Sequence, residues 1–185
     1  MNTLASDLLS EIKGIYSGKI AVQAICYDVD RPMLDVHKNG DYIATNLWSY
    51  YPWHLGDTKD DNVSQILEHV EAKFDQFLEP CSANATKPII IEQLSSASYD
   101  GGMIAACDND EEIDSFHEDN ASWHLDLQEQ ADVYEAVLHA IGKRKWIVGN
   151  FAFTYFFWDS IGKDINIRAK PVESVLKKWY TWMQP

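Results

Sequence analysis

The sequence is short of basic residues. Its 15 Lys and Arg stand against 29 Asp and Glu, which gives the 185-residue chain a formal net charge of −14. Because polyanions repel such a chain, this composition argues against nucleic acid and an anionic membrane surface as partners. A neutral ligand such as a sugar suits the charge. The seven Trp, nine Tyr and seven Phe supply candidate stacking surfaces as well as core.

Cysteine is also scarce, and long apolar runs are missing. Cys26, Cys81 and Cys107 are widely spaced and form no CxxC or zinc-binding pattern, so we expect free thiols in a reducing compartment. No apolar run reaches the ~18 residues that span a bilayer. Residues 1–16 show neither the basic nor the apolar region of a signal peptide. The sequence thus predicts a cytoplasmic protein that does not enter a membrane.

Several motifs that hold cofactors or nucleophiles are absent. The chain has no GxGxxG, no Walker A loop, no GxSxG and no HExxH, which argues against nucleotide binding, α/β-hydrolase chemistry and zinc catalysis. The acidic stretch 108–119 has a faint EF-hand-like spacing, but Ile113 stands where that loop needs glycine. A solvated charge run is a better interpretation than a calcium loop, so we expect no metal and no cofactor.

The sequence does contain an alternation of apolar strands and amphipathic helices. Its 46% hydrophobic content supports one domain with a real core. Four strand–helix units with parallel strands are half of the eight that close a TIM barrel, so residues 1–185 are predicted to form one (βα)4 half TIM barrel. We expect strands at 19–27, 41–47, 87–92 and 146–153, helices at 6–15, 62–77, 126–141 and from Pro171 onward, and connections at 28–39, 81–86 and 95–125.

The stretch 87–96 carries the strongest candidate for chemistry. Ile89, Ile90 and Ile91 are typical of a strand that is covered on both faces, and Glu92 ends the run. A carboxylate just past a buried strand is costly unless it has a task. At the carboxyl end of a barrel strand, that task is catalysis. A solvated Glu at the strand end is the alternative interpretation.

Four stretches resemble the C-terminal half of clan A glycoside hydrolases, and most closely family 113, the β-mannanase-like TIM barrels. They are KPIIIE at 87–92, Asp-Gly-Gly at 100–102, EQADVYEA at 129–136 and RAKPVESVLKKWY at 168–180. The resemblance implies that Glu92 is the nucleophile at the end of the seventh strand of a barrel that cleaves β-linked sugars. It also implies that the acid/base glutamate lies on the fourth strand, upstream of this chain.

With one candidate catalytic glutamate, the chemistry is incomplete, and with four strands, the barrel is incomplete. Glycoside hydrolysis needs two carboxyl groups, and an open sheet leaves two unpaired edges. We therefore expect a homodimer that completes an eight-stranded barrel, with the two Glu92 side chains approaching across it. Thr45, Asn46, Ile90 and Phe151 are candidates for the barrel interior or its rim.

The aromatic residues after two of the strands are candidate sugar-binding residues. Trp48, Tyr50, Tyr51 and Trp53 follow the second strand, where the resemblance implies sugar stacking and a Tyr hydroxyl bonded to Glu92. Packing beneath a loop is the alternative for these four.

Further polar and aromatic residues follow the strands. Trp158, after the fourth strand, resembles the family's Trp at the floor of the sugar subsite, with core or dimer packing as the alternative. Asn46, in the second strand, completes the predicted substrate-binding set. Asp28, Asp30 and His37, after the first strand, either bind sugar hydroxyls or cap a loop.

Two alternatives stay open beside a glycosidase that acts on β-linked sugars. One is a non-catalytic carbohydrate-binding or scaffold half-barrel that lacks the acid/base carboxylate. The other is a fragment of a longer glycosidase. The missing second carboxylate is the feature that distinguishes these three interpretations.

Overall fold

The protein contains one four-stranded sheet with the order β1-β2-β3-β4. The computed structural model describes residues 2–28, 30–49, 53–58, 60–103, 124–153, 155–157, 162 and 164–183. All neighbouring strands are parallel, as the alternating sequence pattern predicts. The strands are β1 Ala21–Gln23, β2 Tyr42–Trp48, β3 Ile89–Ser95 and β4 Ile147–Ala152.

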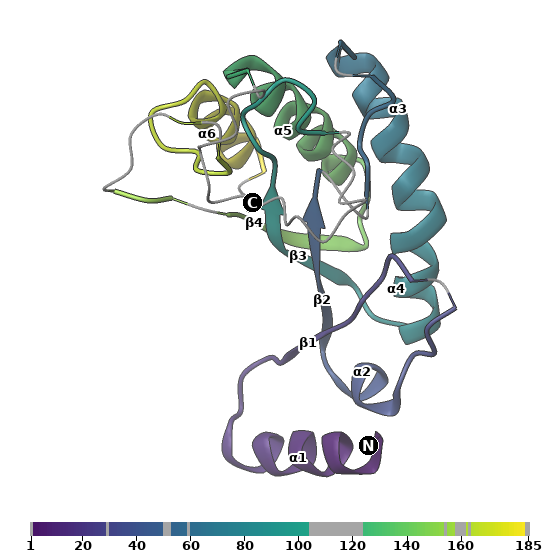
Figure 1. Ribbon diagram of the computed structural model, residues 1–185. Coiled ribbons are helices and arrows are strands. Elements are labelled where there is room, and N and C mark those ends of the chain that lie inside the picture. The colour runs from purple at the N-terminus through teal and green to yellow at the C-terminus, as the bar shows by residue number, and fades with distance from the viewer. Residues whose placement is uncertain are drawn as a thin grey trace.

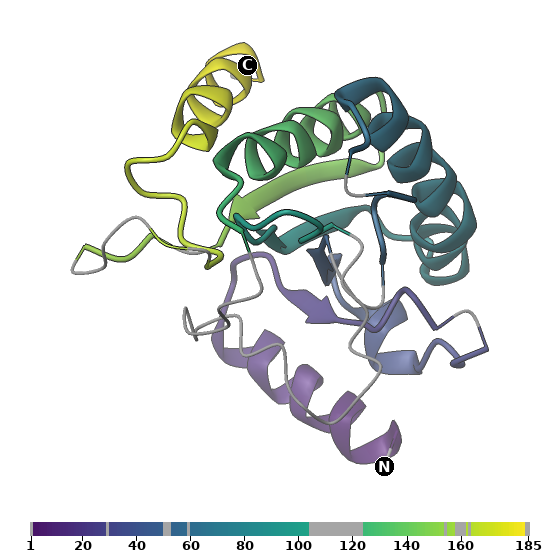
Figure 2. The same ribbon diagram turned by 45° about the horizontal axis from the view of Figure 1, so that its top comes forward.

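Helices connect the strands and cover one face of the sheet. Figures 1 and 2 show α3 and α5 side by side against this face, with α1 and α6 at opposite ends of the arrangement. A single π-helical segment, Phe74–Leu78, joins α3 to α4. The helices are α1 Asn2–Ile15, α2 Asp35–Asn39, α3 Val63–Lys73, α4 Glu79–Ala85, α5 Leu127–Gly142 and α6 Val172–Trp182.

Two segments predicted as connections are helical. The expected loop 28–39 contains α2, where the Leu34 amide and the His37 side chain form a local cap that apolar periodicity does not reveal. The expected connector 81–86 is wrong as well, because the helical path continues through the π-helical segment into α4 and ends at Thr86 in a left-handed conformation. The first strand is shorter than predicted. It covers only Ala21–Gln23 and pairs with β2 alone in the described sheet.

The hydrophobic core lies between one face of the sheet and the helices. Ile43 and Leu47 of β2 and Ile89, Ile91 and Leu94 of β3 are all fully buried there. Since side chains alternate along a strand, these residues define the core face. The helices contribute, among others, Ile66, Val70, Phe74, Tyr134, Val137 and Leu176.

The opposite face of the sheet, here called the inner face, carries three of the four side chains predicted for a barrel interior. Ile90 lies between the core residues Ile89 and Ile91, and Phe151 is 62% exposed. Asn46 follows the buried Thr45 and is itself only partly covered. The prediction for Thr45 is wrong, because this residue pairs with Ile91 and is fully buried on the core face.

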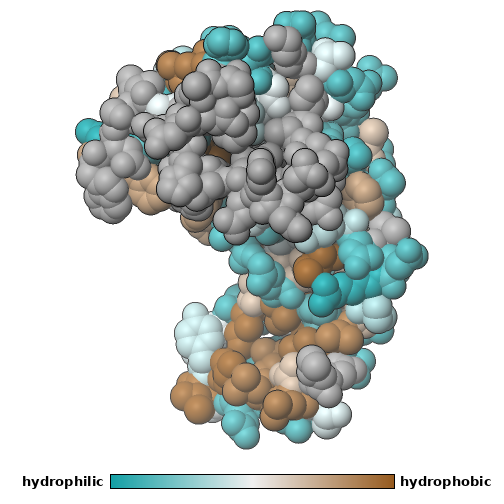
Figure 3. Space-filling view, in the orientation of Figure 1, coloured by the Kyte–Doolittle hydropathy of each residue, from teal (hydrophilic) through white to brown (hydrophobic). Residues whose placement is uncertain are grey.

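Helix α1 confirms the predicted helix 6–15 but buries little of its apolar surface. Of the predicted apolar face, only Leu9 is buried, while Leu8, Ile12 and Ile15 are exposed. Figure 3 shows hydrophobic residues gathered at the end of the molecule where α1 lies in Figure 1. The amphipathic pattern therefore predicts the helix correctly without predicting a neighbour for it.

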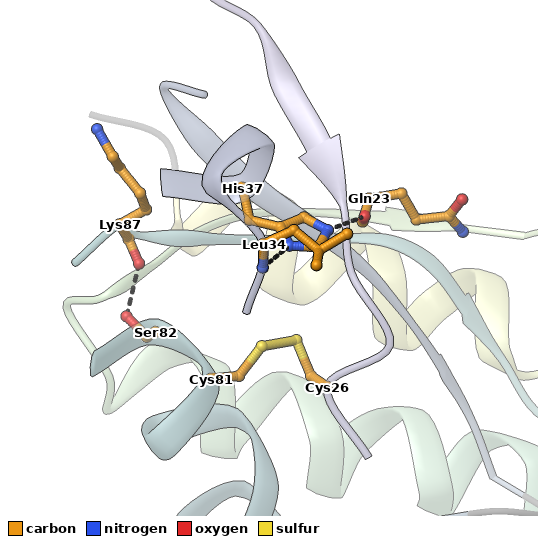
Figure 4. Close-up of a disulfide and its surroundings, with 7 residues drawn as sticks. All are labelled: Gln23, Cys26, Leu34, His37, Cys81, Ser82 and Lys87. Atoms are coloured by element: carbon orange, nitrogen blue, oxygen red, sulfur yellow. Dashed lines mark hydrogen bonds between the residues drawn. A yellow bond between two sulfur atoms is a disulfide. The ribbon is translucent and has the colours of Figure 1, made fainter. Parts of the chain in front are cut away.

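A disulfide bond links Cys26, after β1, to Cys81 in α4 (Figure 4). The expectation of free thiols is wrong for these two cysteines, whose Cα atoms lie 5.5 Å apart although 55 positions separate them in the sequence. Disulfides persist mainly in oxidising environments, so the cysteines no longer support the predicted cytoplasmic location. Cys107 lies outside the described residues.

Among the helices that the structure describes, none is both long enough and apolar enough to cross a membrane.

Candidate functional site

Glu92 occupies a bulge in the middle of the sheet. Thr45 of β2 pairs with Ile91, and the next residue, Asn46, pairs with Gln93, so Glu92 is an extra residue opposite β2. On the other side, the register also shifts between Ile91 and Leu94. Bulges of this kind re-aim side chains and are common beside active sites.

Two consecutive polar side chains at the bulge lie away from the core. Ile91 and Leu94 are three positions apart, yet both are fully buried on the core face. Glu92 and Gln93 between them are only partly covered, which places both on the inner face. Glu92 does not end the strand, as predicted, because β3 continues to Ser95. The three-isoleucine run ends at the bulge, and the strand continues past it.

The Glu92 carboxylate is available for a ligand. No described residue forms a hydrogen bond or ion pair with it. It is also the one acidic residue in the four strands. A partly covered carboxylate is suited to bind or attack a ligand, and the catalytic role of Glu92 stays a prediction.

A pocket of about 350 Å³ lies at the carboxyl end of β1 and reaches Asn46. Since Asn46 pairs with Gln93, the neighbour of Glu92, the pocket borders the bulge. Its walls offer hydrogen-bonding and stacking groups from Tyr27, Arg31 and His37. The sequence analysis did not include Tyr27 and Arg31 in the predicted site. Both follow the first strand closely, and that position indicates the carboxyl edge of the sheet.

His37 has a structural task in this pocket. Its Nδ1 accepts a hydrogen bond from the Leu34 amide at 3.0 Å, and its Nε2 donates to the Gln23 carbonyl at 3.1 Å (Figure 4). Burial lowers the pKa of His37, and the hydrogen bond to Gln23 opposes this effect. A neutral ring fits both bonds, so the structure supports the loop-capping alternative for this residue.

The predicted aromatic residues fall into two groups. Tyr50, Tyr51 and Trp158 lie outside the described residues. Trp48, the last residue of β2, is partly buried against a small apolar cluster of Ala97, Tyr99 and Ile165.

Trp53 has no exposed surface. The rings of Tyr27 and Phe77 meet it edge-on, with centroids at 6.1 and 5.7 Å. This placement favours the packing alternative for Trp53 over sugar stacking.

Three carboxylates gather where the loop after β3 meets the start of α5. Asp100, Asp126 and Glu129 each offer an oxygen within 4.8 Å of the others. The buried Glu129 carboxylate accepts hydrogen bonds from the amides of Gly101, at 2.7 Å, and Met103, at 3.0 Å. Gly101 has a φ of 87°, a conformation that favours glycine.

The environment of Glu129 favours its protonated form. Its pKa is raised to about 7, because burial and the charges of Asp126 and Asp100, which raise the pKa, outweigh the two amide hydrogen bonds, which lower it. Carboxylate oxygens are ligands for hard cations, but the amide contacts already give Glu129 a structural role that ties the loop to α5. The sequence analysis did not identify this cluster, although the Asp-x-x-Glu spacing of 126–129 at a helix start is a usable signal. The absence of a metal requirement stays a prediction.

A buried polar network holds the carboxyl ends of β3 and β4. The Tyr134 hydroxyl donates to the carbonyl of Leu94 at 2.8 Å and lies 3.3 Å from that of Phe153. The buried Lys170 ammonium pairs with Asp164 at 2.7 Å and donates to the Ser98 hydroxyl at 2.8 Å. Since burial raises the pKa of Tyr134, its hydroxyl keeps its proton and acts as a fixed donor. These contacts tie the segments after β3 and β4 to α5 and to the segment that precedes α6.

Comparisons with solved structures find barrels of glycoside hydrolases. The chain matches a GH113 β-1,4-mannanase with a TM-score of 0.59 and 20% identity over 95% of this chain and 49% of that one. A GH113 β-mannanase from Alicyclobacillus acidocaldarius matches with a TM-score of 0.63 and 14% identity over the same shares. A β-D-glucuronidase from Dictyoglomus thermophilum matches with a TM-score of 0.58 and 14% identity, over 96% of this chain and 28% of that one.

Searches against models of known protein families and against curated proteins found no match. At these identities the structural matches show the fold alone. They agree with the resemblance inferred from the four sequence stretches, and they extend over nearly the whole chain. The chain spans about half the length of the mannanases that it matches, and it has the fold of half a glycoside hydrolase barrel.

Proposed function

We propose that this protein is a glycoside hydrolase that acts on a β-linked sugar, with Glu92 as nucleophile or electrostatic stabiliser. The observation that carries the proposal is the position of Glu92 on the inner face beside a pocket, as a carboxylate to which no described residue bonds. The fold of the matched mannanases and glucuronidase supports the reaction class. Asn46 lines the pocket of the proposed sugar site. Trp48 is proposed to contact the sugar as well, and the same role for Tyr50, Tyr51 and Trp158, which lie outside the described residues, stays a prediction from the sequence.

The reaction needs a second carboxyl group. Retaining enzymes hold the two groups about 5–5.5 Å apart, and inverting enzymes about 6.5–9.5 Å apart. The four strands contain only Glu92, so no other strand residue of this chain fills the role. Two copies joined edge to edge form an eight-stranded barrel in which each chain supplies one Glu92. An eight-stranded interior is narrow enough for side chains to fill it, so inward carboxylates from opposite strands approach each other.

The test is a panel of aryl β-glycosides, including mannosides and glucuronides, with the release of the phenol as readout. Glu92→Gln removes the charge and keeps the shape, so we expect hydrolysis to be lost while the thermal midpoint stays nearly unchanged. Glu68→Gln, an exposed carboxylate on α3, is the matched control and keeps full activity. An active Glu92→Gln enzyme disproves the assignment.

The missing second carboxylate also favours a second candidate, a half-barrel that binds carbohydrate without cleaving it. In that case manno-oligosaccharides bind in calorimetry, no glycoside of the panel is hydrolysed, and Glu92→Gln weakens binding only. Wild-type hydrolysis of any glycoside in the panel rules this candidate out.

A further inference from the structure

Two apolar surfaces lie at opposite ends of the sheet. The first, here called the α1 face, consists of Leu4, Leu8, Ile12 and Ile15, which follow helical spacing and are 39–90% exposed. It belongs to the helix that precedes β1, whose outer edge has no strand neighbour in the described sheet. Exposed apolar surface of this kind marks an interaction site when it is contiguous.

The second surface is a groove of about 640 Å³ beside β4, here called the β4 groove. The edge strand β4 forms one wall and the end of α6 forms the other. Phe151 and Trp182 are 62% and 65% exposed there, and Val148 is also exposed. Like β1, β4 pairs with a strand on one side only in the described sheet.

The α1 face does not reach the β4 groove within one chain. Helix α1 contacts α2, and the whole width of the sheet separates β1 from β4. Figures 1 and 2 show α1 and α6 at opposite ends of the arrangement. Each surface thus lies beside a free strand edge that the other surface of a second copy is able to meet.

We propose that the α1 face of one copy docks into the β4 groove of a second copy, and reciprocally, around a two-fold axis. This inference rests on the proposed dimeric glycosidase and names the contact that joins its halves. In this arrangement β1 of each copy runs beside β4 of the other, so both free edges are paired and both apolar surfaces are covered. The second copy also supplies the carboxylate that each site lacks.

Charge supports a second copy as the occupant. Asp7 and Glu11 each lie three residues after a leucine of the α1 face, and they form an exposed acidic border along it. The β4 groove is bordered by Arg144 and Lys145, in a chain whose net charge is −14. Arg144 already pairs with Asp75 at 2.8 Å, whereas Lys145 is exposed. The exposed Lys145 therefore complements the acidic border of α1 on an otherwise acidic molecule.

The experiment measures the solution mass of the full chain by light scattering after gel filtration, across micromolar concentrations. We expect a dimer for the wild type, and at least tenfold weaker association for Leu8→Asp and for Trp182→Asp, which change opposite sides of the contact. Ser10→Asp, on the exposed opposite side of α1, remains a dimer. A monomeric wild type, or a dimer that both Leu8→Asp and Trp182→Asp leave intact, overturns the proposal.

Charge exchange tests the contact without relying on an apolar position. Glu11→Lys and Lys145→Glu each weaken the dimer, and the double variant restores it. A mixture of Ile12→Cys and Trp182→Cys chains, both in a Cys107→Ser background, forms a disulfide-linked heterodimer that neither forms as efficiently alone. Failure of both the charge rescue and the cross-link overturns the α1 contact, even if a dimer exists.

The outcomes separate this contact from the proposed chemistry. Glu92→Gln abolishes hydrolysis but leaves the dimer mass unchanged. A wild-type monomer that cleaves glycosides overturns the docking and leaves the glycosidase assignment standing. A dimer with the expected variant pattern and no hydrolysis supports the docking and leaves the binding half-barrel as the function.

Discussion

Asn46 of β2 pairs with Gln93 of β3 and skips Glu92. This single register step places Glu92 and Gln93 on the same face of the sheet and returns Leu94 to the core. Strand alternation after the buried Ile91 already keeps Glu92 out of the core, and the register step adds Gln93 to the same face. The same step places Asn46, a wall of the pocket, directly beside the bulge.

Asn46 and Asn150 form a matched pair for testing the inner face. Asn46 lines the pocket, while Asn150 accepts a hydrogen bond from the Tyr180 hydroxyl at 2.9 Å on the core side. We expect Asn46→Ala to weaken sugar binding by about tenfold, the loss of roughly one hydrogen bond, with little change in stability. We expect Asn150→Ala to lower stability and to leave sugar binding nearly unchanged. Calorimetry and urea unfolding measure both effects, and equal sugar affinity for wild type and Asn46→Ala contradicts the site.

Trp53 is expected to act in folding. Its ring is fully buried between Tyr27 and Phe77, so Trp53→Ala removes a large core side chain and lowers the free energy of unfolding by about 3–5 kcal/mol. Urea unfolding at neutral pH measures the loss. The folded fraction keeps its sugar affinity. Normal stability together with weaker binding shows instead that Trp53 stacks on sugar.

The disulfide between Cys26 and Cys81 is expected to stabilise the fold. It closes a long stretch of chain, since its cysteines are 55 positions apart. Loop-closure entropy predicts that the double variant Cys26→Ala and Cys81→Ala loses about 2–4 kcal/mol. Urea midpoints with and without a thiol reductant measure this, and the double variant no longer responds to the reductant. Cys107→Ser is the control, and a wild type that is insensitive to reductant contradicts the prediction.

Glu129 makes stability depend on pH near neutrality. Its pKa in the folded protein is about 7, above the ordinary value of 4.5, so the folded state binds more protons than the unfolded state between these values. Stability from this group is therefore complete below pH 4.5 and is lost as the pH rises through 7, on the order of 3 kcal/mol in all.

The check is the free energy of unfolding of Glu129→Gln between pH 5 and 8, in steps of about one unit around the pKa. The variant keeps a side-chain oxygen for the Gly101 or Met103 amide and does not titrate, so its stability changes less with pH than that of the wild type. Glu68→Gln follows the wild type. Parallel pH curves for wild type and Glu129→Gln refute the assignment.

The amino-acid sequence was sufficient to predict the main architecture. Apolar runs around Ile43, Ile90 and Val148 predicted three of the strands within a few residues, and the periodic residues of 126–141 predicted α5. These elements follow from local pattern, because a strand or helix that buries one face must repeat its apolar residues at its own period. The position of Glu92 directly after three isoleucines likewise singled it out in the sequence as a candidate functional residue.

Tertiary contacts decided the rest. The helix ending at Ala85 and the disulfide of Cys81 depend on α4 lying beside the loop after β1, a meeting of segments that local pattern does not encode. Trp53 and Thr45 are buried because of the segments that pack against them. A shift of one residue in strand register moves a side chain from one face of the sheet to the other. The sequence alone thus determined the four strands, the longer helices and the carboxylate that stands out, whereas the packing of distant segments decided the short helices α2 and α4 and the burial of Thr45 and Trp53.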